Sequence, residues 1–172
     1  MTRDHLFQQP NISRRSGIFL LTAMLFLGCI VGIWLSGDAQ EQFADALQAL
    51  SVPPVGFVPL AVLLLPLLLS ALAVYVKWPV FLFPLAFWKA FFFAYVFSGF
   101  MSVLGGAGWL ICSLGLFSGI FSLPVFCWYW LQHLDGTGFC LRTFLPALAA
   151  AAAIGLLDLR VISSFLARIL IS

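Results

Sequence analysis

The sequence predicts an all-α, polytopic membrane protein: a transmembrane helical bundle of about five hydrophobic segments, the middle ones broken by glycine and proline. The first observation behind this is composition, since 63% of the 172 residues are hydrophobic and 8% are charged. A soluble domain has about 45–50% apolar and about 25% charged residues. The second observation is a mean hydropathy of +1.13. The third is a series of nearly charge-free runs long enough to cross a bilayer, so lipid is their expected solvent.

The first segment follows a polar stretch with three arginines, residues 1–16, which is predicted to be a cytoplasmic N-terminal tail. Residues 17–172 are expected to form a single membrane domain. The run 17–36 has no charge and as a helix would be about 30 Å long, enough to cross the hydrocarbon core. It is longer than the ~7–15 apolar residues of a signal peptide, so an uncleaved span is predicted.

The loop at 37–54 is predicted to be external, and it carries three acidic residues and no basic residue. Phe43, Leu47 and Leu50 recur at helical spacing, which predicts a short surface helix. Four further spans are predicted at about 55–76, 79–104, 107–130 and 143–160. Glycines and prolines between residues 79 and 124 make a re-entrant segment an alternative to one full crossing.

The placement of Lys and Arg predicts that the N-terminus is cytoplasmic, because basic residues favour the inner side. Three arginines precede the first span and none lies in the loop that follows it. With this orientation Lys77 and Arg142 also fall inside. Five crossings would put Arg160 and Arg168 outside, against the rule. Either the C-terminal tail lies along the inner surface, or a middle segment is re-entrant.

Lys89 is the most informative single residue, because it lies about eleven residues into the third span. A lysine near the bilayer centre costs roughly 2.5–3.5 kcal/mol on insertion scales. Three environments could offset this cost: snorkelling on a short or tilted helix, a buried pair with Asp158, or a substrate or ion site. The sequence leaves all three open. Asp158 and Arg160 are two residues apart, so on a helix they face different sides and need not pair.

Glycine and proline dominate the region from the end of the third span into the fourth. Small residues let helix backbones approach closely in a membrane. A tight contact between the third and fourth spans is therefore predicted, lined by Gly99, Gly105, Gly108, Gly115 and Gly119. Gly105 and its neighbour would also permit a short turn. Pro124 is expected to kink the fourth span.

No pattern for catalysis, metal binding or cofactor binding stands out, so no enzyme activity and no cofactor are predicted. The four cysteines form no CxxC pair and are expected to act as small apolar residues. His133 is expected to be a solvated loop residue. The eight basic residues form no patch, which argues against nucleic-acid binding.

Several of these features occur together in a fixed order. They are Lys77-Trp78-Pro79-Val80, Lys89, Gly105 and Gly108, and the stretch SGIFSLPVF from Ser118 to Phe126. This order resembles the stage II sporulation protein M family of membrane proteins, over about residues 12–130. Members have a segment similar to P-H-G-I-F-E-L-P. The residues of this chain that match that segment are Gly119, Ile120, Phe121, Leu123 and Pro124.

The chain also departs from the family at three positions. Ser118 and Ser122 stand where the family has His and Glu, and Ala90 stands where glycine is common. The resemblance implies a non-enzymatic protein of the bacterial cytoplasmic membrane. Sporulation members act as a scaffold that holds cell-wall-remodelling enzymes at the septal membrane during engulfment. The expected partners are therefore the lipid bilayer, such membrane or cell-wall-remodelling proteins, and a second copy of the chain. A transporter or permease subunit, with Lys89 beside a broken pathway, is the alternative.

Overall fold

The computed structural model describes residues 13–49, 58–105, 112–113, 117–134 and 138–164. These residues are helical apart from short connections and contain no strand. Three helical segments are long and apolar enough to cross a membrane: Arg14–Ala39, Pro79–Leu104 and Leu141–Ile162. A shorter apolar helix covers Leu60–Tyr75. The prediction of an all-α chain is therefore confirmed for the part of the chain that the structure describes, and three of the five predicted spans correspond to helices long and apolar enough to cross a membrane.

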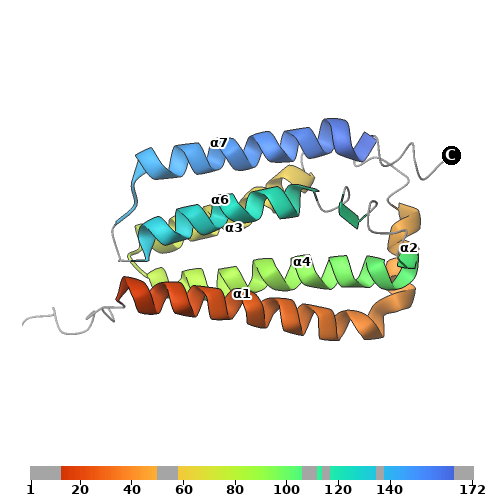
Figure 1. Cartoon of the computed structure of the whole chain (residues 1–172). Coiled ribbons are helices and arrows are strands. Elements are labelled where there is room, and N and C mark those ends of the chain that lie inside the picture. Colours follow the sequence, from red (N-terminus) through yellow and green to blue (C-terminus); the bar gives the residue numbers. More distant parts are fainter. Residues whose placement is uncertain (1–12, 50–57, 106–111, 114–116, 135–137, 165–172) are drawn as a thin grey trace, which may run out of the picture.

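Five long helices run alternately in opposite directions, as Figure 1 shows. The helices are α1 (Arg14–Ser36), α3 (Val58–Tyr75), α4 (Leu82–Leu104), α6 (Phe117–His133) and α7 (Leu141–Leu157), with the short α2 (Gln40–Ala49) between the first two. Short 3-10 turns at Gly37–Ala39 and Pro79–Phe81 precede α2 and α4, and a π-helical turn at Asp158–Ile162 extends α7. The starts of α1, α4 and α7 therefore share one end of the bundle with the ends of α3 and α6.

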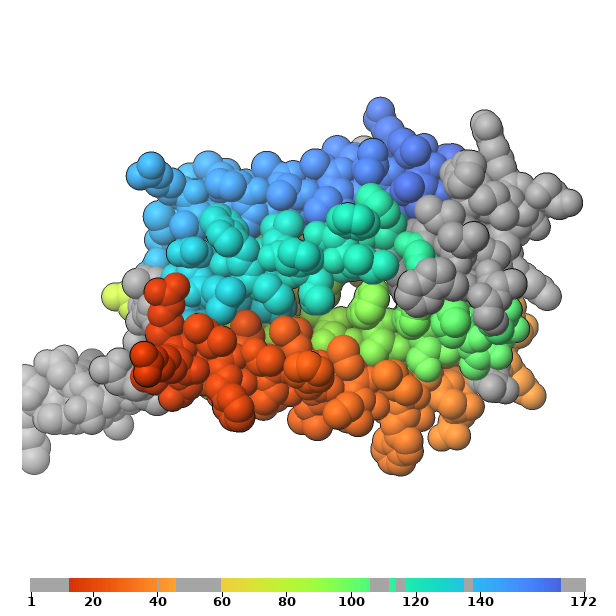
Figure 2. Space-filling model, in the orientation of Figure 1, coloured from red at the N-terminus to blue at the C-terminus, as the bar shows by residue number. Residues whose placement is uncertain are grey.

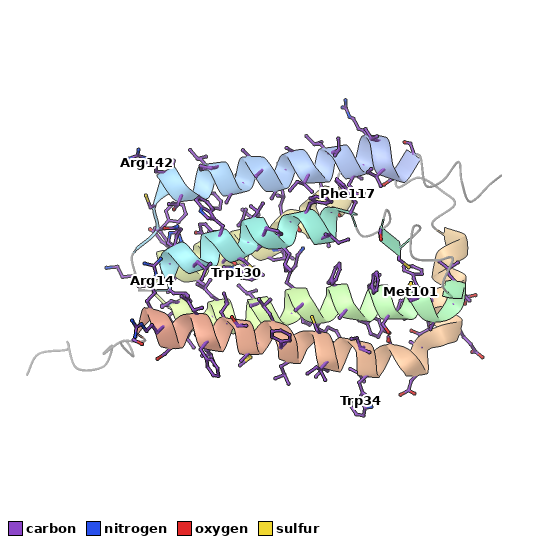
Figure 3. All side chains as sticks on the ribbon, viewed as in Figure 1. Arg14, Trp34, Met101, Phe117, Trp130 and Arg142 are labelled. Atoms are coloured by element: carbon purple, nitrogen blue, oxygen red, sulfur yellow. The ribbon has the colours of Figure 1, made fainter. Side chains whose placement is uncertain are left out.

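Charge is distributed unequally between the two ends of the bundle. Arg14, Arg15, Lys77 and Arg142 all lie at the end that holds the start of α1, which we call the basic end; Figure 3 labels Arg14 and Arg142 there. The opposite end, which we call the acidic end, carries three exposed acidic residues, Asp38 just before α2 and Glu41 and Asp45 on α2. Among the described residues, Arg160 is a basic residue at the acidic end.

The prolines of the middle segments do not break the helices. Pro66 lies inside α3 and Pro124 inside α6, and both helices continue through them. The prediction of broken middle segments is therefore wrong at these two positions. An apolar helix tolerates proline because neighbouring helices and local adjustments satisfy the backbone groups that it frees.

Gly105 ends α4 with φ +61° and ψ −156°, a backbone conformation that favours glycine. Gly108 and Gly115, which were predicted to line a helix contact, lie outside the described residues. The described part of the fourth predicted span, 107–130, consists of residues 112–113 and of α6, which begins at Phe117 and ends at His133.

Helices α1 and α4 pack against each other along most of their length. Gly28 and Gly32 of α1 face α4, and a Cβ at residue 32 would lie 2.6 Å from the Phe91 carbonyl oxygen. The facing residues of α4, Ala90 and Ala94, are small and buried. Two glycines four residues apart against two alanines four residues apart form the close contact that drives helix association in membranes.

Helices α1 and α4 form one layer of the bundle. The second layer consists of α3, α6 and α7, which lie together on the other side of the bundle in Figure 1. On α7 the inward stripe is again small, with Ala147, Ala151 and Gly155 buried. Between α6 and α3, the Trp130 indole N–H donates a buried hydrogen bond to Ser70 Oγ at 2.8 Å. The small residues of α7 and the hydrogen bond between α6 and α3 therefore hold these three helices together.

The two layers meet at the basic end. One cluster of buried residues joins all five long helices there, and its largest members are Leu67, Leu82, Phe126, Tyr129 and Trp130. Farther along the bundle, α4 makes few contacts with α3 or α6. The tight glycine contact predicted between the third and fourth spans is thus absent from the described residues, and the close glycine contact joins α1 to α4 instead.

Helix α2 lies across the acidic end (Figure 1). The predicted short helix is confirmed over Gln40–Ala49. Its Phe43 is buried against Gly99 of α4, with ring centroids 5.1 Å from Tyr95 and 5.4 Å from Phe100. Since a Cβ on Gly99 would collide with the Phe43 ring, this glycine serves the α2–α4 contact.

Candidate functional site

A groove of about 1100 Å³ lies between α3 and α4 and extends from Val76 and Trp78 at the basic end past the middle of the bundle. Its walls come from α3, from Trp78 and Phe81, and from the Pro84–Val96 part of α4. Ser118 and Gly119 of α6 border it. Figure 2 shows an opening between α4 and α6 at this level. The groove is the space that remains because α4 makes few contacts with α3 and α6.

Lys89 lines this groove and is the charged residue among its described walls. The residue is half-buried, and its Nζ lies 4.8 Å from the centroid of the Phe126 ring. A helical side chain points toward the start of its own helix, so the ammonium is directed toward the basic end. The aromatic face stabilises the cation by about 0.5–2 kcal/mol, which offsets part of the cost of burying it.

The structure does not pair Lys89 with Asp158, although both residues were candidates for one buried pair. The cation contacts the Phe126 ring. Asp158 begins the π-helical turn after α7 and lies beside Ser118 of α6. Ser118 and Phe126 are eight residues apart on α6, a separation of about 12 Å along the helix axis. The Lys89 ammonium and Asp158 therefore lie at different levels of the bundle.

One face of α6 points inward and carries Ser118, Ser122 and Phe126, which are four residues apart in turn. Ser122 is completely buried, and its Oγ donates to the Gly119 carbonyl at 3.2 Å. Ser118 borders the groove. The two serines that depart from the family pattern therefore lie on the inner face of α6, between Asp158 and the Lys89 ammonium.

The remaining candidate residues divide between the two faces of α6. Gly119 faces α4, since a Cβ there would lie 3.4 Å from the Phe93 ring. Phe121 is 52% exposed and packs on Phe117 with ring centroids 4.4 Å apart. Pro124 is also exposed. The structure thus brings Lys89 and Gly119 together at the groove and places Phe121 and Pro124 on the outer surface.

The basic end contains a buried polar cluster that the sequence did not predict. His133 lies in the last turn of α6 and is only 2% exposed, so its prediction as a solvated loop residue is wrong. Its Nδ1 lies 2.9 Å from the Tyr129 carbonyl oxygen, and its Nε2 lies 3.3 Å from Thr143 Oγ1 of α7. The signal available was spacing, because His133 follows Tyr129 by one helical turn.

The titratable residues that the structure describes form no group of three or more His, Cys, Asp or Glu side chains able to hold a metal ion. Comparisons of the chain with protein-family models, curated proteins and solved structures found no match. The resemblance to the stage II sporulation protein M family therefore stays a prediction. The groove, the docked α2 and the separation of charge are the observations from which function can be inferred.

Proposed function

We propose that this protein is a non-enzymatic, multi-pass scaffold of the bacterial cytoplasmic membrane that recruits membrane or cell-wall-remodelling partners. The observation that supports the proposal is the packing of α2 against α4. Phe43 fixes the helix against α4, while Asp38, Glu41 and Asp45 stay exposed. A rigid acidic platform at the membrane surface suits electrostatic recruitment of partners with basic surfaces.

In this proposal all five long helices cross the membrane, and the basic end is cytoplasmic. Four described basic residues lie at that end and one at the other, which is the asymmetry that orients membrane proteins. Helix α6 is the shortest crossing, and its 17 residues span about 26 Å. The acidic platform then faces outward, on the side where cell-wall enzymes act.

The orientation can be tested with single cysteines placed in a chain that lacks its four native ones. Asp38→Cys should react with a membrane-impermeant maleimide on intact spheroplasts, because the acidic end faces outward. Arg142→Cys should react only after permeabilisation. Labelling of both positions from the same side would contradict five crossings.

Partner recruitment can be tested by co-purification from native membranes followed by mass spectrometry. The triple variant Asp38→Asn, Glu41→Gln, Asp45→Asn should lose partners that the unaltered chain retains, because the platform loses its charge while Phe43 still holds α2. Lys89→Met is the matched control and should keep those partners. Equal recovery of partners by the triple variant and the unaltered chain would argue against recruitment through α2.

A transporter or permease subunit is the second candidate, and the groove beside Lys89 is the observation that favours it. In that case Lys89→Met should reduce uptake of anionic solutes by cells while the amount of protein in the membrane stays unchanged. The triple α2 variant should then leave uptake intact. The two candidates thus predict opposite sensitivities for the same two proteins.

A further inference from the structure

The walls of the groove differ from the helix contacts elsewhere in the molecule. Where helices pack closely, the facing residues are small, as at Gly28 and Gly32 of α1 and along the inward stripe of α7. The groove is lined instead by bulky leucine, valine, phenylalanine and tryptophan side chains. Helix interfaces in membranes are enriched in small residues because these let backbones approach. The groove walls are therefore better suited to a flexible hydrocarbon chain than to another helix.

The groove is also accessible from the surrounding lipid. Several side chains on its walls are exposed, including Leu65 and Leu72 of α3 and Trp88 of α4, at 51%, 57% and 54%. Its volume of about 1100 Å³ is slightly above the usual range for small-molecule sites, about 300–1,000 Å³. An apolar chain can therefore enter sideways from the bilayer without crossing the polar surface.

The charge inside the groove selects the head group of such a chain. Lys89 contributes one positive charge, and no acidic residue lies among the described lining residues. Among the residues that the structure describes, no acidic side chain forms an ion pair with the ammonium, which contacts the Phe126 ring. A buried cation of this kind is best neutralised by a single negative charge, since each further buried charge adds a desolvation cost.

We propose that the groove binds a membrane-embedded amphiphile with one long hydrocarbon chain and a carboxylate head group. The carboxylate pairs with Lys89 Nζ, and the chain lies between α3 and α4 toward Val96. Ser118 is the hydroxyl at the far end of the groove, close to Asp158, so the head group belongs at Lys89 rather than there. This site goes beyond partner recruitment by α2 and depends only on the groove lying in the membrane.

Binding can be measured with radiolabelled palmitate on the purified full-length chain in maltoside micelles. We expect saturable binding that approaches one palmitate per chain. Hexadecanol, which has the same chain without the charge, should bind at least about tenfold more weakly, a factor that corresponds to about 1.4 kcal/mol. Equal affinity for the acid and the alcohol would overturn the proposed role of the charge.

Variants of the groove provide the matched controls. Lys89→Met should reduce palmitate affinity to that of hexadecanol, whereas Lys89→Arg, which keeps the charge, should retain most of it. Arg142→Met removes one positive charge from an exposed site outside the groove and should leave binding unchanged. Unchanged palmitate binding by Lys89→Met would contradict the site, and so would an equal loss in Arg142→Met.

A second measurement needs no variant at the charged residue. A palmitate analogue with a photoreactive diazirine near its chain end should label α3 and α4 residues of the groove, which peptide mapping can locate. Labelling mainly on the outer face of α1, such as at Trp34, would overturn the site. So would efficient disulfide crosslinking of Leu69→Cys to a second copy, because a protein would then fill the groove. None of these outcomes affects partner recruitment, which is measured on α2.

Discussion

Replacing Gly32 with alanine is expected to destabilise the protein by about 1–3 kcal/mol, the usual cost of overpacking a close contact. The new Cβ would lie 2.6 Å from the Phe91 carbonyl oxygen and 2.9 Å from the Tyr95 nitrogen. Both atoms belong to the backbone of α4, so the helices must separate to make room. The midpoint of thermal unfolding in detergent, followed by size-exclusion chromatography, measures the effect.

Gly37→Ala is the matched control for this experiment. Gly37 follows α1 in the right-handed helical region, and a Cβ there would have no neighbour within 4 Å. Alanine at this position should be neutral or slightly stabilising, since it reduces the freedom of the unfolded chain. A Gly32→Ala protein as stable as Gly37→Ala would show that α1 and α4 do not depend on the glycine contact.

Trp130→Ala is expected to be the most damaging single truncation, with a loss of about 3 kcal/mol or more. Trp130 is completely buried where the two layers meet, and its indole N–H bonds to Ser70. Removing it opens a cavity in the cluster that joins the layers and leaves a buried hydroxyl without its donor. The unfolding midpoint should fall, and limited proteolysis should become faster.

Trp34→Ala provides the comparison, because Trp34 is 77% exposed on the outer face of α1, as Figure 3 shows. Its side chain lies mostly outside the packed bundle, so its loss should change the unfolding midpoint little. Ser70→Ala should show an intermediate loss of about 1–3 kcal/mol from the unpaired indole N–H. Equal effects of Trp34→Ala and Trp130→Ala would contradict the layer junction described above.

The helices were the most predictable part of this fold, because each depends on a local run of apolar residues. The third predicted span, 79–104, is confirmed as the candidate membrane span Pro79–Leu104. The short helix after the first span also followed from local spacing. The packing of this helix against α4 could not be predicted in the same way, because the residue that accommodates Phe43 is Gly99, more than fifty positions later.

The candidate site was only half predictable. Lys89 stood out because it is a charge inside an apolar span, yet its surroundings depend on how two helix layers meet. The glycine pair at Gly28 and Gly32 was missed because its significance depends on Ala90 and Ala94 of another helix. His133 was misplaced because α6 continues beyond the predicted end of its span. In each case the deciding contact joins residues that are distant in the chain or lie on different helices.

The unequal lengths of the long helices have a consequence for the surrounding lipid. Helices α1 and α4 each have 23 residues and α6 has 17, which correspond to about 35 Å and about 26 Å. In the proposed arrangement of five crossings, a bilayer core of about 30 Å must stretch beside α1 and α4 and thin beside α6. Such hydrophobic mismatch favours shorter-chain lipids next to α6, and it gives the protein a preferred membrane thickness that differs from one side to the other.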